Sequence, residues 1–502
     1  MVNSTSSASV RFLILFLLCF TPVFLCAEHT GPMESVSALE NDILSFYNSA
    51  RTGDTPLLQS FMNTAEYLDD TLHDITVLMK TDAGYLATQS FTYDMAVVSI
   101  VYILMGEYQK AADVLDDFND NFWVMKNGLY GLYNSYRTDA YDFFYTTPRG
   151  ERNLLVIGID GSRMHTGPAL WVGLACQHFF METGSRRYID FMLDIFMWCF
   201  KMAHFEFADG TTGGVSMGYG WGPPWQEIFA TEHNVDYYAF CNNIRRIFQM
   251  NDPEIKLAFK KRDITLEMIE KEIAGTLKWL QRVHRPMGIF LRGINDLGED
   301  KIKALDTISW GVAALGPELM FELKIDPVKM IIQGEKLFQV DVEVEGHRFQ
   351  GFDFTDIEGF QRNRKNTCIW FEGTSQMIVM YHVMADYYRD KGNRTWENNY
   401  RKKALFFTEE IRRFVKTFKL EHNALPYTSL NLSSSEIAYT FSDWWPIARG
   451  KEGEWVPSVI ATSWRYFAEL AFNPLDLFSR RKEPRYLDLD LEEYIPEAAD
   501  PF

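Results

Sequence analysis

The sequence of 502 residues is poor in several features that define common protein classes. It has only six cysteines, two of them within an apolar run near the N-terminus. The other four lie in apolar surroundings with no C-x-x-C spacing, and they are Cys176, Cys199, Cys241 and Cys368. This pattern predicts buried thiols with at most one or two disulfides, and it argues against a structural zinc site.

Positive charge is also scarce. The chain has 49 Lys and Arg against 68 Asp and Glu, which gives a formal net charge of -19. Nucleic acids and anionic membranes attract surfaces rich in Lys and Arg, so we expect neither as a partner. The sequence also lacks a Gly-x-Ser-x-Gly elbow, a phosphate loop and a dinucleotide Gly-x-Gly-x-x-Gly. We therefore expect no cofactor and no metal.

Long apolar runs are missing except at the beginning of the chain. Residues Phe12–Ala27 are uncharged and largely apolar behind Arg11, a run too short for a typical membrane span. They predict a signal peptide over residues 1–27 and a secreted or lumenal protein, with an uncleaved signal anchor as the alternative. Sequons at Asn393 and Asn431 agree with a secreted glycoprotein.

What the chain has in abundance is helical periodicity. An apolar helix followed by a more charged amphipathic helix recurs, as expected for an inner layer wrapped by an outer one. A final helix near Ser458–Leu470 is expected to close a ring, and Gln339–Phe354 predicts one β-hairpin. No linker divides the chain, so residues 28–479 form one domain and 480–502 an acidic tail. The predicted pairs are Ser37–Ala50 with Leu57–Leu78, Phe91–Gly106 with Tyr108–Phe118, Thr166–Glu182 with Arg186–Ala203, Glu232–Phe248 with Thr265–Val283, Asp306–Leu315 with Asp326–Leu337, and Glu372–Arg389 with Thr395–Phe418.

Acidic residues recur at the starts of the apolar helices. In a closed ring of parallel inner helices these starts meet at one end around one funnel, where helix dipoles act on the carboxylates. Asp and Glu also occur near helix starts simply as caps, so the recurrence matters more than any one residue. The residues at these positions are Asp94, Asp160, Glu232, Asp306 and Glu372.

Three motifs accompany these acids, namely Thr-Glu-His-Asn at 231–234, Leu-Asp-Thr-Ile-Ser-Trp-Gly at 305–311 and Trp-Phe-Glu-Gly-Thr at 370–374. With the Gly- and Trp-rich stretches at 158–171 and 209–225, they resemble the six-hairpin glycosidases, especially bacterial glycosidase-like proteins with variants of these motifs. The similarity spans roughly residues 91–470. It implies an all-α (α/α)6 toroid with a small β-hairpin insertion, and carbohydrate chemistry at the helix starts.

Glycoside hydrolysis needs an acid that protonates the leaving oxygen and a second carboxylate that activates water or attacks the anomeric carbon. Glu232 is the first candidate for the general acid, because partial burial after a Trp- and Gly-rich loop would raise its pKa. Asp160, Asp306 and Glu372 are the candidates for the base. By fold analogy we expect an inverting hydrolase of an extracellular poly- or oligosaccharide.

Further side chains are predicted to bind the sugar. Asp236 lies four residues after Glu232, so the two carboxylates share one helical face. Hydrogen-bonding and aromatic residues complete the predicted subsites, where sugar rings pack on aromatic faces. They are His165, His233, Asn234, Asp353, Gln376, Trp171, Trp310 and Trp370.

Two other readings remain open. A polysaccharide lyase or sugar epimerase would use His165, His233 or Tyr237 as a base, and Arg163 is the only cation within the motifs. A non-catalytic glycan-binding or scaffold toroid is the second alternative, since stacked helical pairs also build repeat proteins. A scaffold, however, has no need of acids at one rim. The sugar, its linkage and the oligomeric state are not determined by the sequence.

Overall fold

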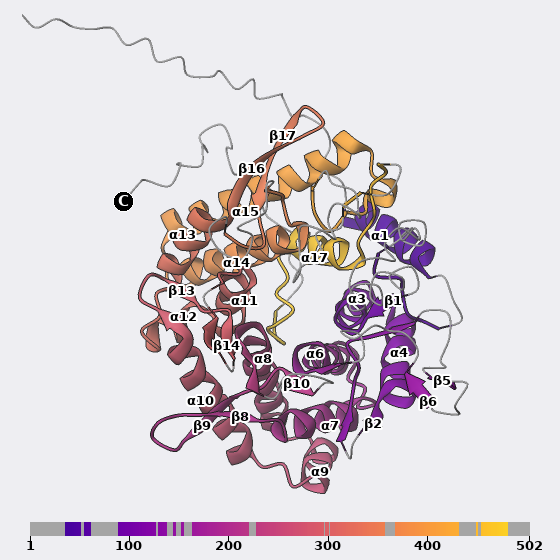
Figure 1. The fold of residues 1–502 in the computed structure, drawn as a ribbon, viewed down its shortest axis with the longest axis vertical. Coiled ribbons are helices and arrows are strands. Elements are labelled where there is room, and N and C mark those ends of the chain that lie inside the picture. The colour runs from indigo at the N-terminus through magenta and orange to yellow at the C-terminus, as the bar shows by residue number, and fades with distance from the viewer. Residues whose placement is uncertain are drawn as a thin grey trace, which may run out of the picture.

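A computed structural model describes residues 36–51, 55–61, 89–126, 129–137, 144–146, 152–154, 163–219, 227–295, 297–300, 302–356, 367–430, 448–449 and 453–479. The predicted signal peptide and acidic tail lie outside these residues, as does Asp160. The described helices form two concentric layers around one centre (Figure 1).

The inner layer is a closed ring. Each inner helix packs against the next one in chain order, and the last packs against the first. These helices are buried on nearly all sides, which explains why their sequences are apolar with little amphipathic contrast. They are α3 (Thr92–Leu104), α6 (Thr166–Thr183), α8 (Thr231–Gln249), α11 (Asp306–Leu315), α14 (Phe371–Asp390) and α17 (Val459–Glu469).

The outer layer is amphipathic, with one apolar face on the ring and one charged face in solvent. Two shorter helices connect inner to outer helices along the chain: α9 (Pro253–Lys261) follows α8, and α12 (Pro317–Glu322) follows α11. No helix in the described part of the chain is long and apolar enough to cross a membrane. The outer helices are α1 (Val36–Ala50), α4 (Tyr108–Asp116) continued by the π-helical turn η4 (Asp117–Phe122), α7 (Ile189–Phe200), α10 (Leu266–Val283), α13 (Pro327–Phe338) and α15 (Arg394–Phe418).

The ring is closed by the two ends of the chain, which differs from the predicted first pair. The helix α1 packs against α17, and the hydroxyls of Tyr47 and Ser463 hydrogen-bond at 2.5 Å. The predicted helix Leu57–Leu78 is wrong at its start, because residues 55–61 are not helical and Phe61 forms a β-bridge with Ser458. The outer position beside α17 is therefore filled by the first described helix.

Short strands precede several inner helices, and sequence periodicity predicted only one hairpin. Strands of two to four residues are too short to show a clear alternation, so only the structure reveals them. Three of them lead directly into α3, α6 and α8, and thus tie the starts of these helices to neighbouring loops. The short strands pair as β1 (Gln89–Phe91) with β4 (Ser135–Arg137), β7 (Met164–His165) with β10 (Gly218–Tyr219), β11 (Phe229–Ala230) with β14 (Gly293–Asn295) and β15 (Gly298–Asp300), β8 (His204–Glu206) with β9 (Thr212–Val215), β2 (Val124–Lys126) with β3 (Leu129–Gly131), β5 (Phe144–Thr146) with β6 (Arg152–Leu154), and β12 (His284–Arg285) with β13 (Ile289–Phe290).

The predicted long hairpin is present as β16 (Gln339–Val344) and β17 (His347–Phe352). Its two turn residues, Glu345 and Gly346, have φ of 51° and 80°. A two-residue hairpin with positive φ at both positions has the turn that matches the twist of its strands. Figure 1 shows the hairpin projecting beyond the ring.

One end of the ring is closed by the segment after α17. Residues 471–479 cross the carboxyl ends of the inner helices (Figure 1). His178 of α6 contacts the carbonyl of Pro474 at 2.7 Å, and Asn473 donates from Nδ2 to the carbonyl of Ala313 in α11 at 2.8 Å. A further short helical turn, η6 (Glu421–Asn423), follows α15. The inner helices begin at the opposite end of the ring.

Candidate active site

The carboxyls at the starts of the inner helices converge at the end of the ring opposite residues 471–479. Asp306 is the first residue of α11, Glu232 and Glu372 are the second residues of α8 and α14, and Asp94 is the third of α3. Asp306 is hydrogen-bonded to Glu232 and lies in the field of Glu372, which in turn lies in the fields of Asp94 and Glu232. The predicted meeting of helix starts therefore brings these four carboxyls together.

Asp306 and Glu232 form a carboxyl pair of unequal exposure. Asp306 is buried, whereas 34% of the Glu232 side chain is exposed. Burial is the main cause that raises the pKa of Asp306 well above its usual range, and the charge and hydrogen bond of Glu232 add to it. The pKa of Asp236, one turn further along α8, is raised well above its usual range by burial and then by Glu232. Burial thus favours the protonated form of both Asp306 and Asp236.

Glu372 is held by a chain of hydrogen bonds whose directions are fixed by chemistry. An indole N–H can only donate, so Trp464 donates from Nε1 to the Tyr93 hydroxyl at 2.7 Å. Tyr93 then donates its own proton to Oε1 of Glu372 at 2.8 Å. Gln376 donates from Nε2 to the same oxygen at 3.1 Å, and its own Oε1 accepts from Ser309 at 3.2 Å. Oε1 of Glu372 thus accepts two hydrogen bonds.

Burial determines whether Glu372 carries a proton. Its side chain is 3% exposed, and burial raises its pKa from 4.5 to about 8, the hydrogen bonds lowering it only in part. Glu372 is therefore a neutral carboxylic acid at pH 7. Oε1 accepts from Tyr93 and Gln376, and a hydrogen bond with Tyr427 also lowers the pKa of Glu372 in part. Asp94, nearby, has a pKa raised by burial to about 7.

Aromatic rings form a floor beneath these carboxyls. Tyr93 lies 5.2 Å from Trp171 and 6.0 Å from Trp310, and Trp464 lies 5.8 Å from Trp171, all between ring centroids. Trp171 and Trp310 are buried, and each has a buried indole nitrogen without a hydrogen-bond partner in the described structure. Both were predicted as sugar platforms, but they pack in the core of the ring: Trp171 lies edge to face with Tyr93 and Trp464, and Trp310 stacks on Trp464.

Trp370 is also a core residue. It is buried against Phe354 at 5.1 Å and Tyr427 at 6.2 Å between ring centroids. A Cβ on Gly373 would come within 2.1 Å of the Trp370 ring, so the first turn of α14 and the indole are in direct contact. Its predicted role in a sugar subsite is replaced by one in positioning the start of α14, which carries Glu372.

Two imidazoles lie beside Glu232. His165 and His233 have ring centroids 6.0 Å apart, and burial lowers the pKa of both, so both rings are neutral at pH 7. Thr166 donates its hydroxyl proton to the carbonyl of Ser216, so it accepts from Nδ1 of His233 at 3.0 Å. Nε2 of His233 is therefore the unprotonated nitrogen, and it lies 3.5 Å from Oε1 of Glu232.

Two residues predicted to bind substrate have structural roles instead. Asn234 accepts from the amide of Val215 at 2.6 Å and donates to the carbonyls of Val215 and Ala230 at 3.0 and 2.8 Å. Asp353 accepts from the amides of Phe354 at 2.7 Å and Cys368 at 3.3 Å. Both are buried, so the prediction that they contact sugar is corrected: they hold loop backbone at the rim.

Sequence reasoning missed Tyr93, Trp464 and Ser309. Tyr93 precedes Asp94 in the chain, but nothing in the sequence indicates that it reaches Glu372, which is 279 positions away. Trp464 lies in the middle of α17, where an apolar helix predicts only a core residue. These contacts exist because the ring closes, and closure has no local signal.

Comparisons with known proteins agree with this geometry at the level of the fold. No protein-family model and no curated protein sequence matches the chain. An α-mannanase of glycoside hydrolase family 76 from Bacteroides thetaiotaomicron has a similar structure, with a TM-score of 0.50 and 10% identity over 86% of this chain and 94% of that one. A cellobiose 2-epimerase from Bacillus thermoamylovorans has a TM-score of 0.49 and 11% identity over 86% and 98%. A D-mannose isomerase has 0.48 and 11% over 87% and 98%.

The chain therefore has the (α/α)6 fold of the six-hairpin glycosidases, as the sequence motifs predicted. In the described residues, no group of three or more His, Cys, Asp or Glu side chains is arranged to hold a metal ion. The four cysteines beyond the N-terminal run are buried.

Proposed function

We propose that the protein is a glycoside hydrolase of a poly- or oligosaccharide in which Glu372 is the general acid. The observation that supports this role is a buried carboxyl with a pKa of about 8 that accepts hydrogen bonds from Tyr93 and Gln376. A general acid must hold its proton at the working pH and release it to a leaving oxygen. Glu232 was the first candidate for this role, but its greater exposure suits the other half of the reaction.

In this proposal Glu232 serves as the base that activates water. Asp306, whose raised pKa favours its protonated form, lies beside Glu232, and 34% of the Glu232 side chain is exposed to solvent. Because Asp306 and Glu232 are in hydrogen-bond contact, they cannot be the two facing carboxyls of an inverting enzyme, which stand about 6.5–9.5 Å apart. The facing pair is Glu372 and Glu232, and inversion is tested by the anomer first released.

The test compares Glu372→Gln with the parent on two kinds of substrate. A glycan panel with reducing-end detection, starting with α-mannan because a structural neighbour is an α-mannanase, identifies a natural substrate. On that substrate we expect Glu372→Gln to lose about 10²–10⁴-fold in kcat. The leaving group of an activated aryl glycoside barely needs protonation, so on that substrate Glu372→Gln should lose much less in kcat.

Glu335→Gln is a matched control. Glu335 of α13 also accepts from a tyrosine hydroxyl, that of Tyr381 at 2.8 Å, but it lies in the outer layer and pairs with Lys403. Its kcat should equal the parent's. Equal losses on both substrates would make Glu372 a mere substrate contact. Glycan binding without turnover in the parent would favour the non-catalytic toroid.

A sugar epimerase is the second candidate, favoured by the neutral His165 and His233 beside Glu232. The unprotonated Nε2 of His233 is able to remove a proton from a sugar carbon. Tyr237 is not such a base, because its hydroxyl is buried and donates to Glu272 at 2.9 Å, which raises its pKa further. Incubation in D2O distinguishes the two functions, since epimerisation introduces deuterium at carbon and hydrolysis does not.

A further inference from the structure

The turn between α14 and α15 lies far from the carboxyls. Glu372 is at the start of α14 and Asp390 at its end, so roughly 27 Å of helix separates this turn from the site. The turn contains Asn393-Arg394-Thr395, an acceptor sequence for N-linked glycosylation. All three residues are exposed. The proposed hydrolase activity makes no use of them.

Asn393 begins α15 in a way that leaves its amide nitrogen available. Its Oδ1 accepts from the amide of Trp396 at 3.3 Å, and its carbonyl accepts from the amide of Glu397 at 3.0 Å. Within the described residues no group accepts a hydrogen bond from Nδ2. A glycan on Nδ2 therefore leaves the N-cap hydrogen bond intact.

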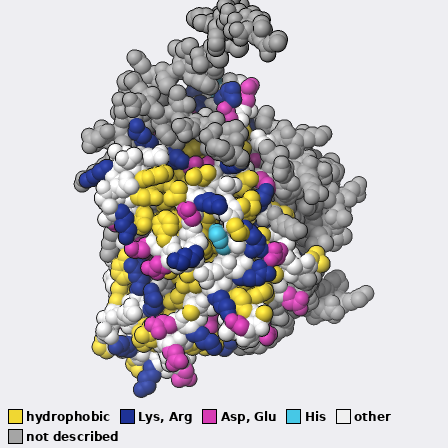
Figure 2. Space-filling view, turned by 90° about the vertical axis from the view of Figure 1, so that its left-hand side faces the viewer, with side chains coloured by type: hydrophobic (Ala, Val, Ile, Leu, Met, Phe, Trp, Pro, Cys, Tyr) yellow, Lys and Arg dark blue, Asp and Glu magenta, His cyan; other side chains and the backbone are white. Residues whose placement is uncertain are grey.

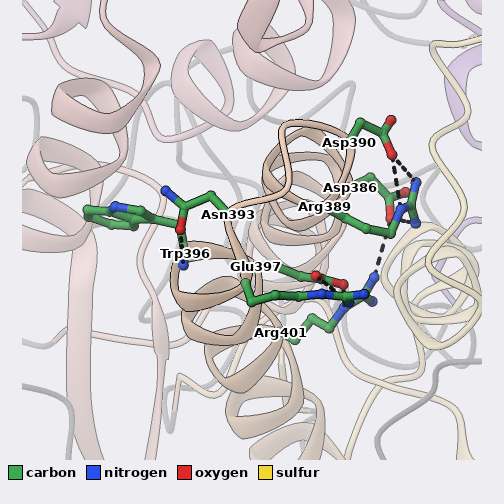
Figure 3. Close-up of polar contacts among 8 residues, drawn as sticks. Asp386, Arg389, Asp390, Asn393, Trp396, Glu397 and Arg401 are labelled. Atoms are coloured by element: carbon green, nitrogen blue, oxygen red, sulfur yellow. Dashed lines mark hydrogen bonds and ion pairs between the residues drawn. The ribbon is translucent and has the colours of Figure 1, made fainter.

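The charged side chains of the turn are engaged on its other side. Arg389 pairs with Asp386 at 2.5 Å, and Arg401 pairs with Glu397 at 3.2 Å and with Asp386 at 3.4 Å. Figure 3 shows this network to one side, with Asn393 and Trp396 directed to the opposite side. A sugar on Asn393 thus displaces no ion pair.

An exposed aromatic ring lies three residues after Asn393. Trp396 is 38% exposed, and it stacks on Tyr388 with centroids 5.6 Å apart and an interplanar angle of 20°. We propose that Asn393 carries an N-linked glycan whose first N-acetylglucosamine lies against Trp396, because the C–H face of a sugar packs well on an aromatic face. Figure 2 shows one exposed side of the ring, where apolar side chains lie among charged ones.

The modification requires a donor of defined chemistry. Nδ2 of Asn393 forms a bond to C1 of an oligosaccharide carried on a polyprenyl diphosphate. The bond from C1 to the diphosphate oxygen breaks, the diphosphate leaves with the electron pair, and the Nδ2 proton passes to a base of the transferase. The proposal rests on entry into a secretory pathway, for which the predicted signal peptide at 1–27 is the motivation.

The full chain with its own N-terminus is expressed in eukaryotic cells, and protein is collected from the medium. It is then treated in ¹⁸O water with an amidase that converts each glycosylated Asn to an ¹⁸O-labelled Asp. Peptide mass spectrometry should find labelled Asp at 393. Thr395→Ala should abolish the label and Thr395→Ser should retain it. Asn393→Asp should fold as the parent does, because it keeps an oxygen for the N-cap, and it should also lose the label.

The contact with Trp396 is tested by removing the glycan from each folded variant. The parent should lose on the order of 1 °C in Tm on deglycosylation. Trp396→Ala should keep the label at 393, but its Tm should not change on deglycosylation. Phe321→Ala, which removes an equally exposed ring from α12, should behave like the parent.

A chain that stays inside the cell, or secreted protein labelled only at Asn431, would overturn the proposal. A Tm loss that persists in Trp396→Ala would overturn the sugar–indole contact. None of these outcomes depends on hydrolase activity, so failure of the glycan proposal and failure of the proposed function are read separately.

Discussion

Replacing Glu372 by Gln should make the folded protein more stable at neutral pH while it removes most turnover. The carboxyl has a pKa of about 8 in the folded protein and an ordinary value of 4.5. Between these values the unfolded chain releases the proton and the folded chain keeps it. Stability is therefore fullest below pH 4.5 and falls as pH rises toward 8, because the folded pKa is the higher one.

The magnitude follows from the two pKa values. Each pH unit between them lowers the free energy of unfolding by about 1.4 kcal/mol. At pH 7 the buried carboxyl therefore costs about 3 kcal/mol, and at pH 8 or above about 5 kcal/mol. Gln does not titrate, and its oxygen still accepts from Tyr93 and Gln376 as Oε1 does in the parent. The variant should escape this cost.

Urea denaturation of the parent, Glu372→Gln and Glu335→Gln at each pH from 4 to 8 measures the effect. The stability difference between Glu372→Gln and the parent should be near zero at pH 4 and grow with pH. Glu335 pairs with Lys403, so Glu335→Gln should show no such growth. A difference that is independent of pH, or one that favours the parent at pH 7, would refute the reasoning, because Glu372 would then be ionised in the folded protein.

Three further outcomes are expected. The kcat/KM of the parent on a natural glycan should fall above about pH 8, where Glu372 loses its proton, and a pH–rate profile without this limb would contradict its role as acid. Tyr93→Phe removes a hydrogen bond that lowers the pKa of Glu372, so the alkaline limb should move to higher pH; it also leaves the buried Nε1 of Trp464 without its acceptor, at a cost of about 1–3 kcal/mol in urea denaturation. Asn234→Ala should lower the free energy of unfolding by about 3 kcal/mol and leave KM unchanged, whereas a raised KM with intact stability would restore its predicted role in substrate binding.

Local patterns in the sequence were sufficient for most of the helices. The spacing of apolar residues predicted α3, α6, α8, α11, α14 and α17 to within a few residues, because each of these helices buries most of its own surface in the ring. Asp326 caps α13 and Pro327 begins it, as predicted from two adjacent residues. The recurrence of acids at helix starts likewise indicated that Glu232, Asp306 and Glu372 lie near one another. These features depend on neighbours within a few positions.

The tertiary structure decided which residues act together and in what state. Glu232 and Glu372 occupy the same position in their helices, but Glu372 is buried deeper within the ring, and that burial raises its pKa to about 8. Asn234 has a structural role because its side chain hydrogen-bonds the backbone of Val215 in β9, and no sequence pattern connects these two residues. Closure by α1 and α17 brings Trp464 to Tyr93, 371 positions away. Desolvation and hydrogen bonding are properties of the surroundings of a side chain, and in a closed ring most of those surroundings come from distant parts of the chain.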